Sequence, residues 1–132
     1  MTVSVPATRI ARILVVDDDA GIREEVAAAL GNDPSLDISV ANDGWLALHQ
    51  IASGQFWPEV ILLDLMMPHV DGDDFLAALD AINHARDIAV IVMTALPASS
   101  IPEGVQRRAR TILFKPFTLA TLAGSLRTVL KH

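Results

Sequence analysis

Short apolar runs alternate with helix-forming segments along the chain, and this alternation restricts the fold more than any other feature. The runs are rich in leucine and β-branched residues, which is typical of strands buried on both faces. The predicted strands are Arg12–Val16, Ile38–Val40, Val60–Leu63, Ala89–Met93 and Thr111–Phe114. The predicted helices are Ala20–Leu30, Trp45–Ile51, Asp73–Ile82, a fourth from about Val105, and Thr118–Leu130. Strands that alternate with helices form a parallel sheet with right-handed crossovers, so the sequence predicts an α/β fold with a doubly wound, five-stranded parallel sheet.

The composition fits one globular domain, because 132 residues with 52% hydrophobic and 20% charged side chains can bury a sizeable core. The absence of cysteine excludes a disulfide framework and a thiolate metal site. A net charge of −6 is repelled by phosphate backbones, which disfavours nucleic-acid binding by this domain alone. We find no signal peptide and no membrane span, and we expect a cytoplasmic location. Residues 1–9 are interpreted as a short N-terminal leader and residues 10–132 as the domain.

Polar residues end four of the five apolar runs. Asp17 and Asp18 follow the first run, Asp64 the third, Thr94 the fourth and Lys115 the fifth. One such residue could be a helix cap, but four together are hard to explain as caps, and no cap requires a lysine. In a doubly wound sheet, ligands bind beyond the carboxyl ends of the strands, where the strand order reverses. The sequence therefore predicts one site at that edge of the sheet.

The residue types at these strand ends suit phosphoryl chemistry. Clustered carboxylates without cysteine or a suitably spaced histidine pair favour a hard cation such as Mg2+, which binds carboxylates together with phosphate oxygens and water. A carboxylate can also act as a nucleophile and form an aspartyl-phosphate. A metal and a lysine would neutralise the developing charge, and a threonine hydroxyl could donate a hydrogen bond to a phosphate oxygen.

Four motifs in the chain, VVDDD, ILLDLMMP, IVMTA and LFKPF, resemble those of receiver domains in two-component response regulators. The resemblance covers nearly the whole chain and implies a flavodoxin-like fold with sheet order 2-1-3-4-5. It implies that Asp64 accepts a phosphoryl group from a phosphohistidine on a histidine kinase or a histidine phosphotransfer protein, and that the domain signals to a downstream protein. Such a domain is not an enzyme, because it catalyses only its own phosphorylation and dephosphorylation.

The resemblance also implies roles for the residues around Asp64. Asp17, Asp18 and Asp64 match the carboxylates that hold Mg2+, and Met66 matches the position whose backbone carbonyl completes the metal site. Further implied features are a switch hydroxyl at Thr94, a phosphate-binding lysine at Lys115, and a cis peptide bond between Lys115 and Pro116.

The sequence departs from the family pattern in the region that follows Thr94. Ile112 stands where the family often has a tyrosine or phenylalanine, which would exclude an aromatic rotamer switch. Arg108-Ala109 stands where Gly-Ala is common, and residues 95–104 are rich in helix breakers. These departures lead to the hypothesis that the route from the phosphoryl group to the output face is altered. The basic cluster of Arg107, Arg108 and Arg110 is interpreted as a solvated face, with partner docking as the alternative and nucleic-acid binding as a remote third.

Two alternative functions stay open from the residues. An aspartate-nucleophile phosphatase would use Asp17, because Asp17 and Asp19 have the Asp-x-Asp spacing of such enzymes. Against it, Ala20-Gly21 follows instead of the expected threonine or valine, and no cap domain is present. Asp19 is more simply a helix cap. The second alternative is a pseudo-receiver that binds partners without being phosphorylated, which Ile112 favours and the complete acidic set opposes.

Overall fold

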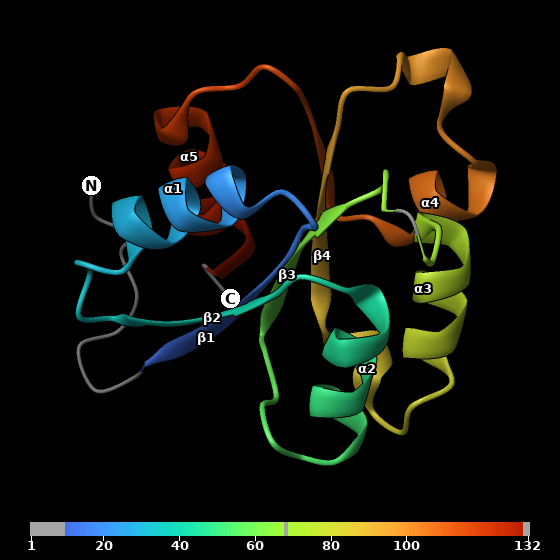
Figure 1. Cartoon of the computed structure of the whole chain (residues 1–132), viewed down its shortest axis with the longest axis horizontal. Coiled ribbons are helices and arrows are strands. Elements are labelled where there is room, and N and C mark those ends of the chain that lie inside the picture. Colours follow the sequence, from blue (N-terminus) through green and yellow to red (C-terminus); the bar gives the residue numbers. More distant parts are fainter. Residues whose placement is uncertain (1–9, 68, 131–132) are drawn as a thin grey trace.

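Five strands and five helices alternate along the chain in the computed structural model, which describes residues 10–67 and 69–130 (Figure 1). All strand pairs are parallel and the sheet order is β2-β1-β3-β4-β5. The strands are β1 (Ala11–Val16), β2 (Leu36–Ala41), β3 (Val60–Asp64), β4 (Ala89–Thr94) and β5 (Thr111–Phe114). The helices are α1 (Ala20–Leu30), α2 (Gly44–Ala52), α3 (Gly72–Asp80), α4 (Glu103–Arg108) and α5 (Leu119–Leu130). The predicted flavodoxin-like fold is confirmed.

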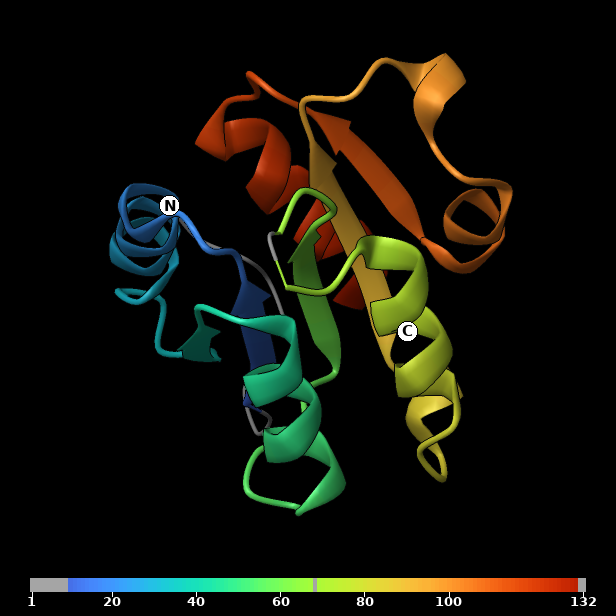
Figure 2. The same cartoon turned by 45° about the vertical axis from the view of Figure 1, so that its right-hand side comes forward.

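Helices cover both faces of the sheet and create two hydrophobic cores. Helices α2, α3 and α4 lie on one face, and α1 and α5 lie on the other (Figure 2). Because side chains alternate along a strand, β1 sends Leu14 and Val16 into the first core, and Ile13 and Val15 into the second. The central strands β1, β3 and β4 are therefore buried on both faces, as their continuous apolar runs predict.

The segment with many helix breakers forms the least regular part of the fold. A short 3-10 turn at Ala98–Ser100 comes first, and α4 begins only after Pro102 and has six residues. The fourth helix thus begins two residues before its predicted start near Val105, and the segment ahead of it is irregular because Pro97 and Pro102 cannot donate backbone hydrogen bonds. The predicted leader, residues 1–9, lies outside the described residues. Among residues 10–67 and 69–130, no helix combines the length and the apolar character needed to cross a bilayer.

Arg108 corrects the prediction of a solvated basic face. Its Nε donates to Asp80 Oδ1 at 2.9 Å, and one terminal nitrogen donates to the carbonyl oxygens of Ala85 (3.2 Å) and Ile88 (2.9 Å). Its side chain is only 18% exposed. Arg108 therefore ties the end of α4 to the end of α3 and to the connection that leads into β4. Arg107, by contrast, is exposed as predicted.

Candidate acidic site at the carboxyl edge of the sheet

The strand register aligns the polar residues that end the strands. Val16 of β1 pairs with Leu63 of β3, so Asp17 and Asp64 are the next residues on two adjacent strands. Asp64 in turn pairs with Met93, the residue before Thr94. The backbone N–H of Lys115 donates to the carbonyl oxygen of Thr94 at 2.7 Å. The sheet order thus places the predicted residues along one edge, with β1 and β3 adjacent at the switch point.

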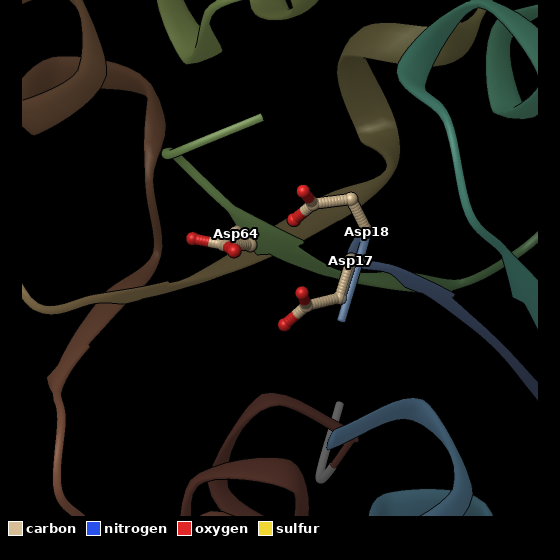
Figure 3. A group of neighbouring side chains, drawn as sticks. All are labelled: Asp17, Asp18 and Asp64. Atoms are coloured by element: carbon tan, nitrogen blue, oxygen red, sulfur yellow. The ribbon is translucent and has the colours of Figure 1, made fainter. Parts of the chain in front are cut away.

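Three carboxylates converge at this edge. Asp17, Asp18 and Asp64 each offer an oxygen atom, and these oxygens lie within 4.8 Å of one another. Figure 3 shows the three side chains gathered at the ends of β1 and β3. Asp17 is fully buried, Asp64 is 5% exposed, and Asp18 is exposed to solvent. The ammonium group of Lys115 lies 3.6 Å from Asp17 Oδ2 and 3.6 Å from Asp64 Oδ2. One lysine therefore faces two buried carboxylates and leaves the cluster short of positive charge.

The protein fixes most polar atoms of Asp17. Its N–H donates to the carbonyl of Ala41 at 3.2 Å, and its Oδ1 accepts from the N–H of Asp19 at 2.9 Å. Asp19 itself caps α1 by accepting from the N–H of Gly21 at 2.8 Å, as predicted. Asp17 Oδ2 accepts no hydrogen bond from any described residue. A buried carboxylate oxygen left in this way has the capacity to bind a cation.

The loop between β3 and α3 is packed tightly beside Asp64. The N–H of Met66 donates to Asp64 Oδ1 at 3.0 Å. A Cβ atom on Gly44 would lie 2.3 Å from Val70, and one on Gly72 would lie 2.2 Å from Leu65, so only glycine permits these approaches. These close approaches involve residues near both ends of the loop, and the separate hydrogen bond from Met66 orients the Asp64 carboxylate.

Thr94 and Lys115 lie at the ends of the neighbouring strands β4 and β5. Thr94 is fully buried, and its Oγ1 accepts from the N–H of Leu96 at 3.0 Å. Because the oxygen acts as an acceptor there, the hydroxyl hydrogen can be donated to another group. The Lys115–Pro116 peptide bond is cis, as the family resemblance implies.

The electrostatics of the cluster act mainly on Asp64. The pKa of its carboxyl is raised from 3.8 to about 6. Burial is the largest cause and the neighbouring Asp17 adds to it, while the Met66 N–H and Lys115 act in the opposite direction. The direction agrees with the geometry, because desolvation and a like charge both disfavour the ionised form. A cation bound among the carboxylates would remove this disadvantage.

The site fits a hard divalent cation. All three side chains offer oxygen, and one of those oxygens, Asp17 Oδ2, is buried without a hydrogen bond from the described residues. Zinc sites that include thiolate are excluded because the chain has no cysteine. An acidic oxygen cluster open to solvent on the Asp18 side is consistent with Mg2+, which retains several water ligands.

Asp18→Ala is expected to stabilise the metal-free protein. The change removes the exposed member of a like-charge cluster, whose repulsion at roughly 5 Å is worth about 1 kcal/mol when water screens it. For a domain of this size that corresponds to a melting temperature about 3 °C higher. Thermal melts in a chelator should show this increase. Mg2+ should raise the melting temperature of the wild type, because a hundredfold excess over Kd adds about 2.7 kcal/mol to the free energy of unfolding. The melting temperature of the variant should rise less.

Asp37→Ala is the matched control, because Asp37 is an exposed aspartate in a surface pair with Arg12. It should leave the response to Mg2+ unchanged. If Asp18→Ala melted below the wild type in chelator, crowding of the three carboxylates would not be a source of instability.

The structure brings together most residues that the sequence predicts. Asp17, Asp18, Asp64 and Lys115 form the cluster. Thr94 follows Met93, the register partner of Asp64, and Met66 lies two residues after Asp64 and donates its N–H to Asp64 Oδ1. Sequence reasoning missed Arg23, whose guanidinium donates to the carbonyl oxygen of Asp17 at 2.7 Å. No motif marks this residue, because its partner is a main-chain atom.

Comparison with known proteins shows a family match over most of the chain. The family model of the response regulator receiver domain matches residues 13–127. Response regulator MprA of Mycobacterium avium (strain 104) is 36% identical over 122 residues, which cover 92% of this chain and 51% of that protein. The chain thus spans about half the length of the curated relatives that it matches.

Solved structures show the same fold over most of the chain. The receiver domain of Francisella response regulator 1452 is 31% identical with a TM-score of 0.77, over 92% of this chain and 97% of that one. Vibrio cholerae chemotaxis protein CheY4 is 27% identical with a TM-score of 0.82, over 92% of this chain and 99% of that one.

Proposed function

Since the chain belongs to the response regulator receiver family, we propose that Asp64 is the residue of its acidic pocket that accepts the phosphoryl group. Domains of this family are signalling modules that have an acidic pocket and a lysine for phosphorylation. Membership in the family implies a cognate histidine kinase. We propose that the donor is a phosphohistidine on that kinase or on a histidine phosphotransfer protein. The observation that carries the proposal is the convergence of Asp17, Asp18 and Asp64 within 4.8 Å, with Lys115 beside them.

The proposed reaction is a displacement at phosphorus. A carboxylate oxygen of Asp64 forms a bond to phosphorus while the bond from phosphorus to the donor histidine nitrogen breaks, and the departing imidazole takes up a proton. Lys115 is placed to neutralise charge on the transferred group, because its ammonium already lies 3.6 Å from Asp64 Oδ2. Thr94 can donate its hydroxyl hydrogen to a phosphoryl oxygen, since its Oγ1 already accepts from Leu96.

Asp17, Asp18, Asp64 and the backbone carbonyl of Met66 would hold Mg2+. The ion, when bound, would neutralise charge on the phosphoryl oxygens and on the acidic cluster. Asp17 and Asp18 serve as ligands in this proposal and are not themselves phosphorylated. Their dissimilar burial is compatible with the assignment, because a fully buried ligand fixes the position of the ion and an exposed one leaves room for water.

The phosphatase alternative places the nucleophile at Asp17. The structure gives little support to that role, because Asp17 is fully buried and its Oδ1 is engaged by the N–H of Asp19. The neighbouring Asp18 is the more accessible of the two carboxylates. Asp64 is nearly as buried, and Lys115 lies 3.6 Å from both carboxylates, so the preference for Asp64 rests on its position in the family motif ILLDLMMP.

Incubation with acetyl phosphate and Mg2+, followed by mass mapping of peptides, tests the assignment. We expect the label on Asp64, and we expect a chelator to prevent labelling. Label on Asp17 would support the phosphatase instead. A protein that binds Mg2+ but takes up no label would be a pseudo-receiver.

A further inference from the structure

Arg23 lies beside the acidic pocket but does not pair with any of its carboxylates. It is half-buried on α1, and one terminal nitrogen donates to the carbonyl oxygen of Asp17 at 2.7 Å. It forms no ion pair with a carboxylate among residues 10–67 and 69–130, although three aspartates precede it closely in the sequence. The guanidinium of Arg23 therefore donates to a neutral main-chain oxygen and not to a carboxylate.

The position of Arg23 does not suit a residue that stabilises its helix. Arg23 is the fourth residue of α1, and α1 has no acidic residue in its first turn. The amino end of a helix carries partial positive charge, so a cation there is disfavoured. The contact with Asp17 gives the side chain a role that helix stability does not explain.

The contact completes the fixing of Asp17. The N–H of Asp17 is held by Ala41 and its Oδ1 by the N–H of Asp19, so the carbonyl oxygen is the remaining main-chain group. Arg23 binds that oxygen and leaves Oδ2 as the carboxylate atom that no described residue engages by a hydrogen bond. Oδ2 is also the atom that lies 3.6 Å from Lys115.

We propose that Arg23 is a positioning residue for the metal site: its guanidinium holds the main chain of Asp17 so that Oδ2 faces the position of the cation. This inference rests on the proposed function, because it assumes that the acidic cluster binds Mg2+. Residues that orient metal ligands typically contribute 10–100-fold to metal affinity. Arg23 acts through Asp17 and need not touch the ion or the phosphoryl group.

The direction in which the Kd for Mg2+ changes on removing Arg23 distinguishes a positioning role from a purely electrostatic one. Removing a cation near a metal site would by itself strengthen Mg2+ binding, because it removes a repulsion. Loss of positioning weakens binding. For Arg23→Met we therefore expect the Kd for Mg2+, measured by calorimetric titration well above the pKa of Asp64, to rise at least about tenfold. An unchanged or lower Kd would overturn the proposal.

Phosphorylation by acetyl phosphate at increasing Mg2+ gives a second readout. The half-saturating Mg2+ concentration should rise with the Kd, while the rate at saturating Mg2+ should stay within about twofold of wild type. A lower plateau with an unchanged half-saturation would contradict positioning, since Arg23 would then act on the transfer itself. Arg23→Gln is the second variant if Arg23→Met does not fold, and the same weakening is expected.

Arg107→Met is the matched control, because Arg107 is 73% exposed and pairs only with Glu103 on α4 among the described residues. It removes the same charge at a distance from the site and should leave Mg2+ binding unchanged. If wild-type protein failed to bind Mg2+ at all, the metal site of the proposed function would be wrong, and the result would be recognised before any variant is compared.

Discussion

Asp64→Asn is expected to abolish phosphorylation by both acetyl phosphate and a phosphorylated kinase. The amide lacks the anionic oxygen that would attack phosphorus, and no other carboxylate of the pocket has the same surroundings. Asp17 is engaged by the N–H of Asp19, and Asp18 is exposed. Intact-protein mass measurement after incubation with donor and Mg2+ should show full or partial labelling of the wild type and none of the variant.

Two further variants make this prediction sharper. Asp37→Asn changes an exposed aspartate at the edge strand β2 and should be labelled like the wild type. Asp17→Asn should still be labelled on Asp64, but only at higher Mg2+, because it removes a ligand and not the acceptor. Undiminished labelling of Asp64→Asn would contradict the assignment and would direct attention to Asp17 or Asp18.

The location of the strand-end residues at one edge of the sheet could be predicted, because each of them follows a continuous apolar run. Val60–Leu63 must be buried on both faces, so the charged Asp64 that follows marks the point where the strand reaches the edge. In a parallel sheet all such ends lie at the same edge. The alternation of elements does not tell which strands are neighbours, however. The adjacency of β1 and β3, which brings Asp17 to Asp64, came only from the family resemblance.

The main-chain partners of Arg23 and Arg108 could not be predicted. Arg108 binds carbonyl oxygens of residues that lie 23 and 20 positions earlier, and Arg23 binds the carbonyl of Asp17. Every residue has a carbonyl group, so these partners leave no pattern in the sequence. A cation can be predicted to pair with a carboxylate by spacing, but not to bind a main-chain oxygen that the tertiary fold places near it.

Ile112 gives a physical basis for the hypothesis of altered signalling. It is partly buried and packs against the core on the α2–α4 face of the sheet. A branched aliphatic side chain at this position has no aromatic ring to rotate, so any response of β5 to Thr94 would be a change in packing. Arg108 would resist movement of the carboxyl end of α4, because its ion pair and carbonyl contacts tie that end to α3. The hypothesis therefore concerns the output face and leaves the acidic site unaffected.

The metal-free protein is expected to lose stability as pH rises from about 4 to about 6. The pKa of Asp64 is raised to about 6 in the folded chain, against 3.8 as its ordinary value. In this interval the unfolded chain has released the proton that the folded chain still holds, so the free energy of unfolding decreases with pH. A shift of this size corresponds to at most about 3 kcal/mol. The contribution of the protonated Asp64 carboxyl to the free energy of unfolding is therefore fully present below about pH 4 and is lost above about pH 6.

Urea unfolding in a chelator, compared between wild type and Asp64→Asn, isolates this contribution from that of the other carboxylates. The two proteins should be similarly stable near pH 4. The variant should be more stable near pH 7, where the wild type holds Asp64 ionised beside Asp17 and, among the described residues, Lys115 alone forms ion pairs with them. Saturating Mg2+ should reverse the slope of the wild type, because a cation binds the deprotonated carboxylates and stabilises the folded chain most where they are ionised. A difference between the two proteins that stays constant from pH 4 to 7 would mean that the carboxyl of Asp64 is not held in its neutral form by its burial. The geometry of the pocket would then have to be relaxed enough in solution for water to reach it.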